Sequence, residues 1–304
     1  MKHLRLLFAF LIILPLARAV EPDASPKTPQ ALIAVLNAYP PEMDAMVKEF
    51  GLDDPRFAQK SIKGFRFYRG EVEGKDVLVV ETGMSMVNAA MALQLALDHF
   101  PITHVLFAGV AGGIDPALHV GDVVIPDQWA YHCEAAYFNP DGKGGHHIAE
   151  YFKQKYPNFG MMFPDDVVAT RSGLDKFDRV PTFPADPSLL ALAKQAIAKL
   201  GPVKGDRSGR VLTIEVGGTG VTGPVFMDNA AYRKFVFEVW KARCLDMETT
   251  AYAHVCYTNG VPFLAVRALS DLAGGQEGKN VIDDNESTSS VNAVRVLRAI
   301  LKEL

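Results

Sequence analysis

Short, uninterrupted apolar runs alternate with segments of helical character along most of this chain. Ala31–Leu36 and His104–Ala108 are almost entirely apolar, which is typical of strands buried on both faces of a sheet. Between them, Ser85–Phe100 is rich in Ala, Met and Leu, which favours a helix. This alternation predicts an α/β fold. We expect a single three-layer domain with a mixed, mostly parallel central sheet flanked by helices.

The same pattern extends to the C-terminus. Strands are expected at residues 65–72, 75–81, 122–131, 210–216, 244–247 and 262–269, and helices at residues 40–50, 187–200, 249–259 and 287–304, with another from Asn229. Residues 134–182 differ, because prolines and glycines such as those of Asn139-Pro140-Asp141-Gly142 interrupt the pattern. We expect a long loop excursion there, with little regular structure beyond one short helix.

The N-terminus predicts a signal peptide at residues 1–19, a linker at 20–30 and the folded domain at 31–304. Lys2 and Arg5 precede the apolar run Leu6–Leu16, which is short for a membrane span, and Ala17-Arg18-Ala19 suits cleavage. An uncleaved membrane anchor is the alternative. Cleavage implies a periplasmic or secreted protein that is not attached to a membrane. In that oxidising compartment we expect buried free thiols rather than a disulfide at Cys133, Cys244 and Cys256.

The composition excludes several classes of partner. The chain has 31 Lys and Arg against 35 Asp and Glu, so it lacks the basic excess of a nucleic-acid-binding protein.

The adjacent His146 and His147 point in different directions and do not predict a metal site. Gly218–Gly223 matches the dinucleotide pattern, but Pro224 follows where the helix should begin, so we expect a flexible substrate loop. Neither a metal nor an organic cofactor is predicted.

Acidic residues follow several predicted strands. Asp246-Met247-Glu248 ends one strand, and Arg267-Ala268-Leu269-Ser270-Asp271 ends another. Glu42 follows the strand predicted at Ala31–Leu36. The glycine-rich segment 109–113 ends a fourth, where glycine lets a ligand approach the backbone. The carboxyl ends of parallel strands meet at one edge of a sheet, where ligands bind. Carboxylates gathered there usually serve chemistry.

In chain order, the segments Gly109–Gly113, Val120–Val124, Asp246–Glu248 and Arg267–Asp271 resemble the motifs of the nucleoside phosphorylase and nucleosidase superfamily. The resemblance is greatest to the 5′-methylthioadenosine/S-adenosylhomocysteine nucleosidases and, through residues 121–129, 226–232 and 270–275, to the exported branch similar to plant bark storage proteins. It covers nearly all of the domain. It implies a nucleoside phosphorylase-like fold that cleaves the N-ribosidic bond of a purine nucleoside.

The resemblance also implies a role for each site residue. Asp271, oriented by Ser270, would be the general acid that protonates N7 of the purine. Glu42, helped by Arg267, would activate water. Glu248 would bind the ribose 2′- and 3′-hydroxyls. The other substrate-binding positions would be Gly109 and Val110 at the glycine-rich strand end, Phe226 stacked on the base, Met227 at the base edge and Met247 beneath the sugar.

Water, rather than phosphate, is the expected nucleophile. Breaking this bond leaves positive charge on the sugar, so an acid at the base and a general base on the opposite face suit hydrolysis. A phosphorylase holds its phosphate with arginines, and the corresponding segments Phe107–Val110 and Leu36–Tyr39 contain none. A phosphate-dependent purine nucleoside phosphorylase is one alternative. A non-catalytic nucleoside-binding or storage protein is the other, because Val110 stands where nucleosidases usually have a hydroxyl side chain. We expect a homodimer in which residues 134–182 of one subunit complete the part of the neighbour's substrate pocket that holds the 5′ substituent of the nucleoside.

Overall fold

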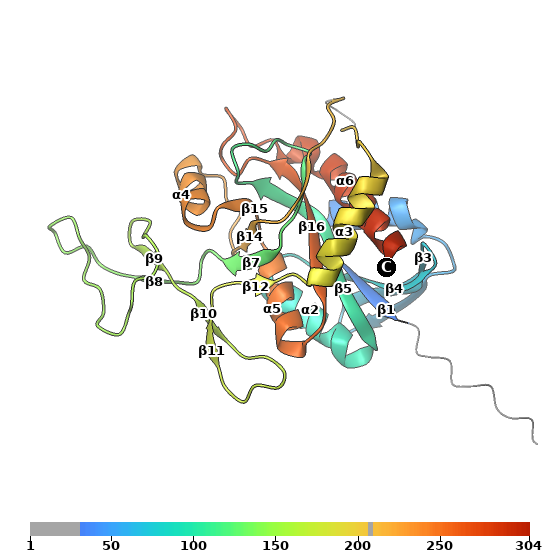
Figure 1. Ribbon diagram of the computed structural model, residues 1–304, viewed down its shortest axis with the longest axis horizontal. Helices are drawn as coiled ribbons and strands as arrows, with labels where there is room; N and C mark the ends of the chain where they lie inside the picture. Colours follow the sequence, from blue (N-terminus) through green and yellow to red (C-terminus); the bar gives the residue numbers. More distant parts are fainter. Residues whose placement is uncertain (1–30, 206–208) are drawn as a thin grey trace, which may run out of the picture. The chain divides into compact units, whose positions relative to one another are not determined.

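The first apolar run forms β1 (Leu32–Asn37), near the middle of a twelve-stranded sheet in the computed structural model, which describes residues 31–205 and 209–304 (Figure 1). β1 pairs in parallel with β4 (Lys75–Glu81) and β5 (Ile102–Gly113), and β5 pairs in parallel with β16 (Phe263–Asp271). These strands are buried on both faces, which is why their apolar runs are continuous. The predicted α/β fold is confirmed. The predicted signal peptide and linker lie outside the described residues.

Further strands extend the sheet on both sides of this centre. Antiparallel pairing adds β3 (Phe65–Val72) and β2 (Ala58–Ile62) beyond β4. On the other side of β5 the sheet continues through β15 (Ala242–Asp246), β14 (Thr219–Thr222), β7 (Gln128–Tyr131) and β12 (Phe183–Pro184). A branch from β16 adds β6 (Val123–Ile125) and β13 (Ile214–Val216).

Two helical layers cover the two faces of the sheet. Leu32 and Ala34 of β1 belong to a hydrophobic cluster with α2 (Met86–His99) and α5 (Thr249–Asn259). Ile33 and Val35, on the opposite face, pack with the helices α1 (Pro40–Met46), η1 (Val47–Gly51), α3 (Pro187–Leu200) and α6 (Ile282–Glu303). A third cluster lies under α4 (Ala230–Trp240). The chain therefore has the three layers that the sequence predicts (Figure 1).

The excursion at residues 134–182 has a different structure from the one expected. Its described residues form no helix but two small antiparallel pairs, β8 (Ala135–Tyr137) with β9 (Met162–Pro164) and β10 (Val167–Ala169) with β11 (Asp178–Val180). Edge-to-face contacts among Phe138, Phe152 and Phe163 hold the first pair together. These segments extend away from the sheet at the left of Figure 1. Prediction of a helix here was wrong because aromatic packing across the loop, rather than local periodicity, orders the chain.

Both glycine-rich segments belong to strands. Residues 218–223 were expected to form a flexible substrate loop, but Thr219–Thr222 is the buried strand β14 between β7 and β15. A Cβ at Gly220 would lie 2.4 Å from the Trp129 ring, so glycine is needed for β14 to pack against this indole. The other segment, Gly109–Gly113, forms the C-terminal end of β5, as expected from the sequence.

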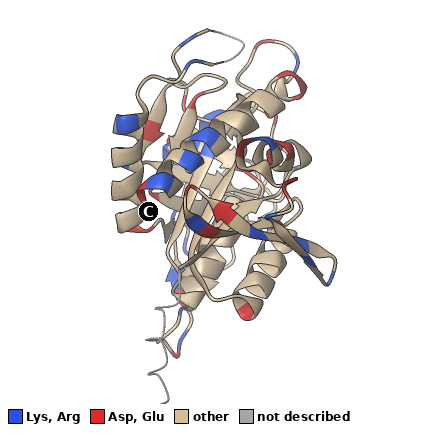
Figure 2. Cartoon of the chain, turned by 90° about the vertical axis from the view of Figure 1, so that its right-hand side faces the viewer, with Lys and Arg blue, Asp and Glu red and all other residues tan. Residues whose placement is uncertain are grey.

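Cys133, Cys244 and Cys256 are all free, as expected, although Cys133 is only half-buried. Basic and acidic residues are interspersed over the side of the chain shown in Figure 2. Among the described helices, none combines the length and the apolar character needed to cross a bilayer.

Candidate active site

Glu42 is buried at the start of α1, where its carboxylate accepts three backbone hydrogen bonds. Its Oε2 accepts from the N–H groups of Ala38 and Tyr39 at 2.8 and 3.1 Å, and its Oε1 accepts from Val110 N–H at 2.8 Å. Pro40 begins the helix, and a glutamate at the third helical position reaches back to cap it. Helix capping therefore fixes Glu42 against the end of β5.

Arg267 is the buried cation of the site. Its Nη1 lies 3.6 Å from Glu42 Oε1 and its Nε lies 3.2 Å from Asp246 Oδ2, while Nη2 donates to the Val110 carbonyl. The guanidinium also lies 4.2 Å from the centre of the Phe107 ring. A buried charge needs such compensation. Nη1 and Nε are buried and make no hydrogen bond with any described residue.

Gly109 makes room for this ion pair. A Cβ at this position would lie 2.0 Å from Glu42 Oε1 and 2.5 Å from Arg267 Nη1. From the sequence we expect a ligand to approach this glycine, whereas the structure places two side chains of the protein there. Gly109 is thus required for Glu42 and Arg267 to meet over β5.

Glu248 lies at the beginning of α5, and its Oε1 accepts a hydrogen bond of 2.7 Å from Ser85 N–H. Ser85 has φ of 78°, a backbone conformation that non-glycine residues rarely adopt. Burial, reinforced by the charge of Asp246, raises the pKa of Glu248 to about 8. Burial also raises the pKa of Glu42, although Arg267 and the backbone donors oppose this effect.

Asp246, for which no role is predicted from the sequence, links β14, β15 and α5. Its Oδ1 accepts from the Thr222 hydroxyl at 2.6 Å and from Thr249 N–H at 3.1 Å, and its Oδ2 faces Arg267 and the Thr249 hydroxyl. The signal was present in the sequence, because an acidic residue ends a buried strand three positions before a threonine. Asp246 is thus a second counter-ion of Arg267, facing Nε, whereas Glu42 faces Nη1.

Asp271 lies at the end of β16, next to β5, and its position there depends on a shift in the register of these two strands. Between Leu269 and Asp271 the pairing of β16 with β5 becomes irregular, so that Asp271 rather than Ser270 lies opposite Gly112. Such bulges re-aim side chains. The buried carboxylate accepts from Ala273 N–H at 2.7 Å through Oδ1 and from the Ser270 hydroxyl at 2.9 Å through Oδ2. Glu42 therefore adjoins residue 110 of β5, and Asp271 adjoins residue 112.

The remaining predicted residues lie around this network in different environments. Met227 is buried, Met247 is half-buried between the two acidic residues of its motif, and the Phe226 side chain is 58% exposed. The structure thus brings Glu42, Val110, Glu248 and Arg267 together and places Ser270 and Asp271 beside them. The stacking of Phe226 on a base and the contact of Met247 with a sugar stay predictions.

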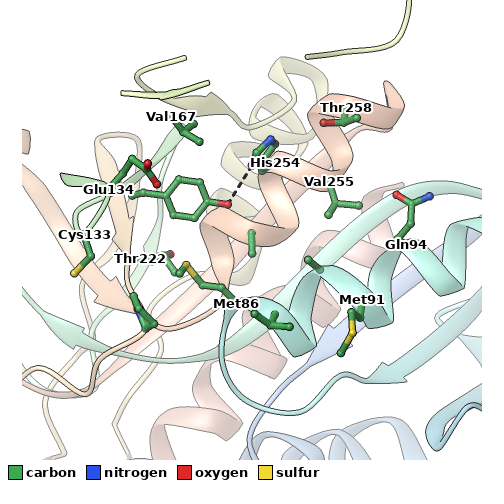
Figure 3. A pocket seen from close by; sticks show the side chains of 15 residues that line it. Met86, Met91, Gln94, Cys133, Glu134, Val167, Thr222, His254, Val255 and Thr258 are labelled. Carbon is green, nitrogen blue, oxygen red and sulfur yellow. Dashed lines mark hydrogen bonds between the residues drawn. The ribbon is translucent and has the colours of Figure 1, made fainter. Parts of the chain in front are cut away.

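A cavity of about 570 Å³ lies between α2 and α5 and does not include Glu42 or Asp271 (Figure 3). Its wall is mainly apolar and includes Met86, Met91 and Val255. Thr222, whose hydroxyl donates to Asp246, also lines it, so the cavity adjoins the polar network. Among the described residues, no three His, Cys, Asp or Glu side chains are grouped to hold a metal ion.

Comparison with known families accounts for this combination of fold and motifs. The family described as the phosphorylase superfamily matches residues 32–304. The chain belongs to the phosphorylase superfamily. The resemblance seen in the sequence motifs is thereby confirmed.

Named relatives of this superfamily member are nucleosidases. It is 31% identical to the 5′-methylthioadenosine/S-adenosylhomocysteine nucleosidase of Halalkalibacterium halodurans, with 81% of this chain and 89% of that protein aligned. It is 28% identical to the nucleosidase of the same name from Pseudoalteromonas translucida, over 90% of this chain and 97% of that protein.

Solved structures show the same fold at lower identity. The 5′-methylthioadenosine/S-adenosyl homocysteine nucleosidase of Helicobacter pylori matches with a TM-score of 0.67 and 20% identity, covering 90% of this chain and 99% of that one. Futalosine hydrolase from the same organism matches with a TM-score of 0.67 and 20% identity, covering 90% and 98%.

Proposed function

We propose that this protein hydrolyses the N-ribosidic bond of purine nucleosides of the 5′-methylthioadenosine/S-adenosylhomocysteine type and releases the free base. The observation that carries the proposal is the buried network of Glu42, Arg267 and Glu248 with Asp271 at the adjacent strand end. The names of the relatives agree with this activity.

Each group has a step in the proposed reaction. Protonated Asp271 donates its proton to N7 of the purine as the bond between C1′ and the base breaks. A water molecule, oriented by Arg267 Nη1, gives its proton to Glu42 while its oxygen bonds to C1′. Glu248, with its raised pKa, donates to or accepts from the ribose hydroxyls. A well-placed acid or base contributes roughly 10²–10⁴ in rate.

Hydrolysis is favoured over phosphorolysis by the charges around Arg267. This arginine already faces Glu42 and Asp246, so a phosphate dianion placed there would meet two carboxylates. Phosphorylases of this superfamily would need further arginines, which the segments at residues 36–39 and 107–110 lack. Water needs no such compensation.

Product analysis tests the proposal. Purified protein is incubated with methylthioadenosine, adenosylhomocysteine and adenosine, with and without phosphate, and the products are separated by chromatography. Free adenine in phosphate-free buffer is the expected result. Strict dependence on phosphate, with ribose 1-phosphate as product, would instead identify a phosphorylase. Calorimetric binding without any release of base would identify a binding or storage protein.

We also propose that the active form is a homodimer. Exposed apolar side chains on and beside α2, namely Met84, Val87 and Met91, suit burial against a second copy, and two of them, Val87 and Met91, also line the cavity. The arms at residues 134–182 would then reach the neighbour's site. Sedimentation equilibrium tests this proposal, with a dimer expected at micromolar concentration and a monomer contradicting it.

The location of the protein is a separate proposal. The charged start, the short apolar run and Ala17-Arg18-Ala19 support export by a cleaved signal peptide to a periplasm or the medium. N-terminal sequencing of the exported protein should begin at Val20. An intact Met1 on membrane-bound protein would support an anchor instead.

A further inference from the structure

Two segments that follow β14 and β16, strands separated in the sheet by β15 and β5, touch each other backbone to backbone. Residues 226–229 lie after β14 and are called the base segment, because Phe226 and Met227 are predicted to contact the base. Residues 271–280 begin with Asp271, the last residue of β16, and are called the acid segment. Gly274 has φ of +88°, and a Cβ on it would lie 2.3 Å from Asn229 N and 2.7 Å from the carbonyl carbon of Asp228. Because only glycine permits this approach, the two segments are packed together rather than merely adjacent.

An exposed carboxylate joins the same two segments through side chains. Asp228 Oδ1 accepts a hydrogen bond from Gln276 Nε2 at 2.7 Å and another from Asn280 Nδ2 at 3.0 Å. Gln276 Oε1 in turn accepts from the N–H groups of Leu272 and Gly274, each at 3.3 Å. One residue of the base segment thus organises both amide side chains of the acid segment.

Asn280 extends this link to Asp271. The nitrogen that donates to Asp228 also lies 3.3 Å from Asp271 Oδ1. A primary amide carries two N–H donors, so Nδ2 can serve both carboxylates at once. The buried Asp271 is therefore connected to the surface through a single amide group.

The hydrogen bonds of Asp271 differ between its two oxygens. Oδ1 accepts from Ala273 N–H and from Asn280, which occupies both of its lone pairs. Among the described residues, Oδ2 accepts a hydrogen bond only from the Ser270 hydroxyl, and that hydroxyl has a second acceptor, the Ala111 carbonyl, at 3.4 Å. A proton on Oδ2 is therefore compatible with these contacts, whereas a proton on Oδ1 would displace a donor.

We propose that Asn280, anchored by Asp228, is a positioning residue that makes Oδ2 of Asp271 the oxygen from which the purine receives its proton. The inference rests on the proposed nucleosidase function. As the C1′–base bond breaks, the proton passes from Oδ2 to N7, the bonding electrons stay with the base, and Oδ2 again accepts the Ser270 hydroxyl. The anchor also keeps the acid in register with Phe226 and Met227 of the base segment.

A pair of variants at Asp228 tests this inference. Asp228→Ala removes the acceptor that anchors Asn280, so kcat for adenosine or methylthioadenosine is expected to fall about tenfold with KM nearly unchanged. Asp228→Asn keeps an acceptor oxygen and should restore kcat to within about twofold of the wild type. Lys279→Ala, beside Asn280 and exposed, serves as the matched control with unchanged kcat. All three substitutions are at exposed positions, and thermal unfolding checks that each variant is folded.

Asn280→Ala provides a second measurement, because it removes the amide itself and should lower kcat at least as much as Asp228→Ala. Wild-type kcat in Asp228→Ala would overturn the inference while leaving the proposed function intact. An equal loss in Asp228→Asn would also overturn it, since that variant retains the anchor. No base release by the wild-type protein from any nucleoside would overturn the proposed function, and this inference with it.

Discussion

Arg267 Nη1 lies 3.6 Å from Glu42 Oε1 and makes no hydrogen bond with any described residue. Asp246 faces Nε of the guanidinium, and the Val110 carbonyl accepts a hydrogen bond from Nη2. These two contacts fix the orientation of Nη1. This pairing gives the site a fixed donor beside a fixed carboxylate, which is what the orientation of a water molecule requires.

Replacing Arg267 with Met should destabilise the protein strongly. The substitution leaves Glu42 and Asp246 buried without their cation, and loss of one partner of a buried ion pair costs about 3–5 kcal/mol. Urea denaturation measures the free energy of unfolding. A surface substitution such as Lys194→Ala is the control, and an equal stability of Arg267→Met and the wild type would contradict the pairing.

Glu42→Gln should remove the general base at a moderate cost in stability. The single glutamine oxygen can accept either from Val110 N–H or from the N–H groups of Ala38 and Tyr39, but not from both sides, while Arg267 keeps Asp246 as a counter-ion. We expect kcat to fall roughly 10²–10⁴-fold because the general base is lost, and the free energy of unfolding to fall by about 1–3 kcal/mol because a buried backbone donor is left unpaired. Steady-state kinetics and denaturation on the same preparation check both parts. Retained turnover would remove Glu42 from its proposed role.

Asp271→Asn should reduce kcat far more than substrate binding. The amide preserves the size of the side chain but cannot deliver a proton to N7, so a loss of roughly 10²–10⁴ in kcat is expected. Calorimetry with a substrate that the variant turns over slowly measures the dissociation constant. A variant that bound poorly but kept its kcat would show that Asp271 serves recognition only.

Glu248→Gln should change how stability depends on pH. The folded-state pKa of Glu248, about 8, is higher than its ordinary value of 4.5, so protonation favours the folded state. This contribution is complete below about pH 4.5 and is lost as pH rises through about 8. Glutamine cannot ionise, so the variant should exceed the wild type in stability at pH 9 by on the order of a few kcal/mol and match it near pH 4.5. Parallel pH dependence of the two proteins would exclude a raised pKa.

Local sequence patterns were sufficient where the physical cause is local. Continuous apolar runs predicted β1, β5 and β16, because a strand buried on both faces needs apolar residues at every position. The acidic residues that end strands identified the edge of the sheet where the site lies, since parallel strands share a direction. From these patterns the three layers and most candidate residues could be predicted.

Only the tertiary structure determined the contacts between distant segments. The register shift before Asp271 places this carboxylate, rather than Ser270, beside Gly112, and no pattern within β16 encodes a pairing with β5. Gly218–Gly223 was expected to be a loop, but its residues Thr219–Thr222 form β14, in which Gly220 packs against Trp129 of the neighbouring strand β7. Asp228 and Asn280 lie 52 positions apart and meet because their strands share one sheet edge. Such contacts depend on packing between elements, whereas sequence periodicity reports only the burial of each element by itself.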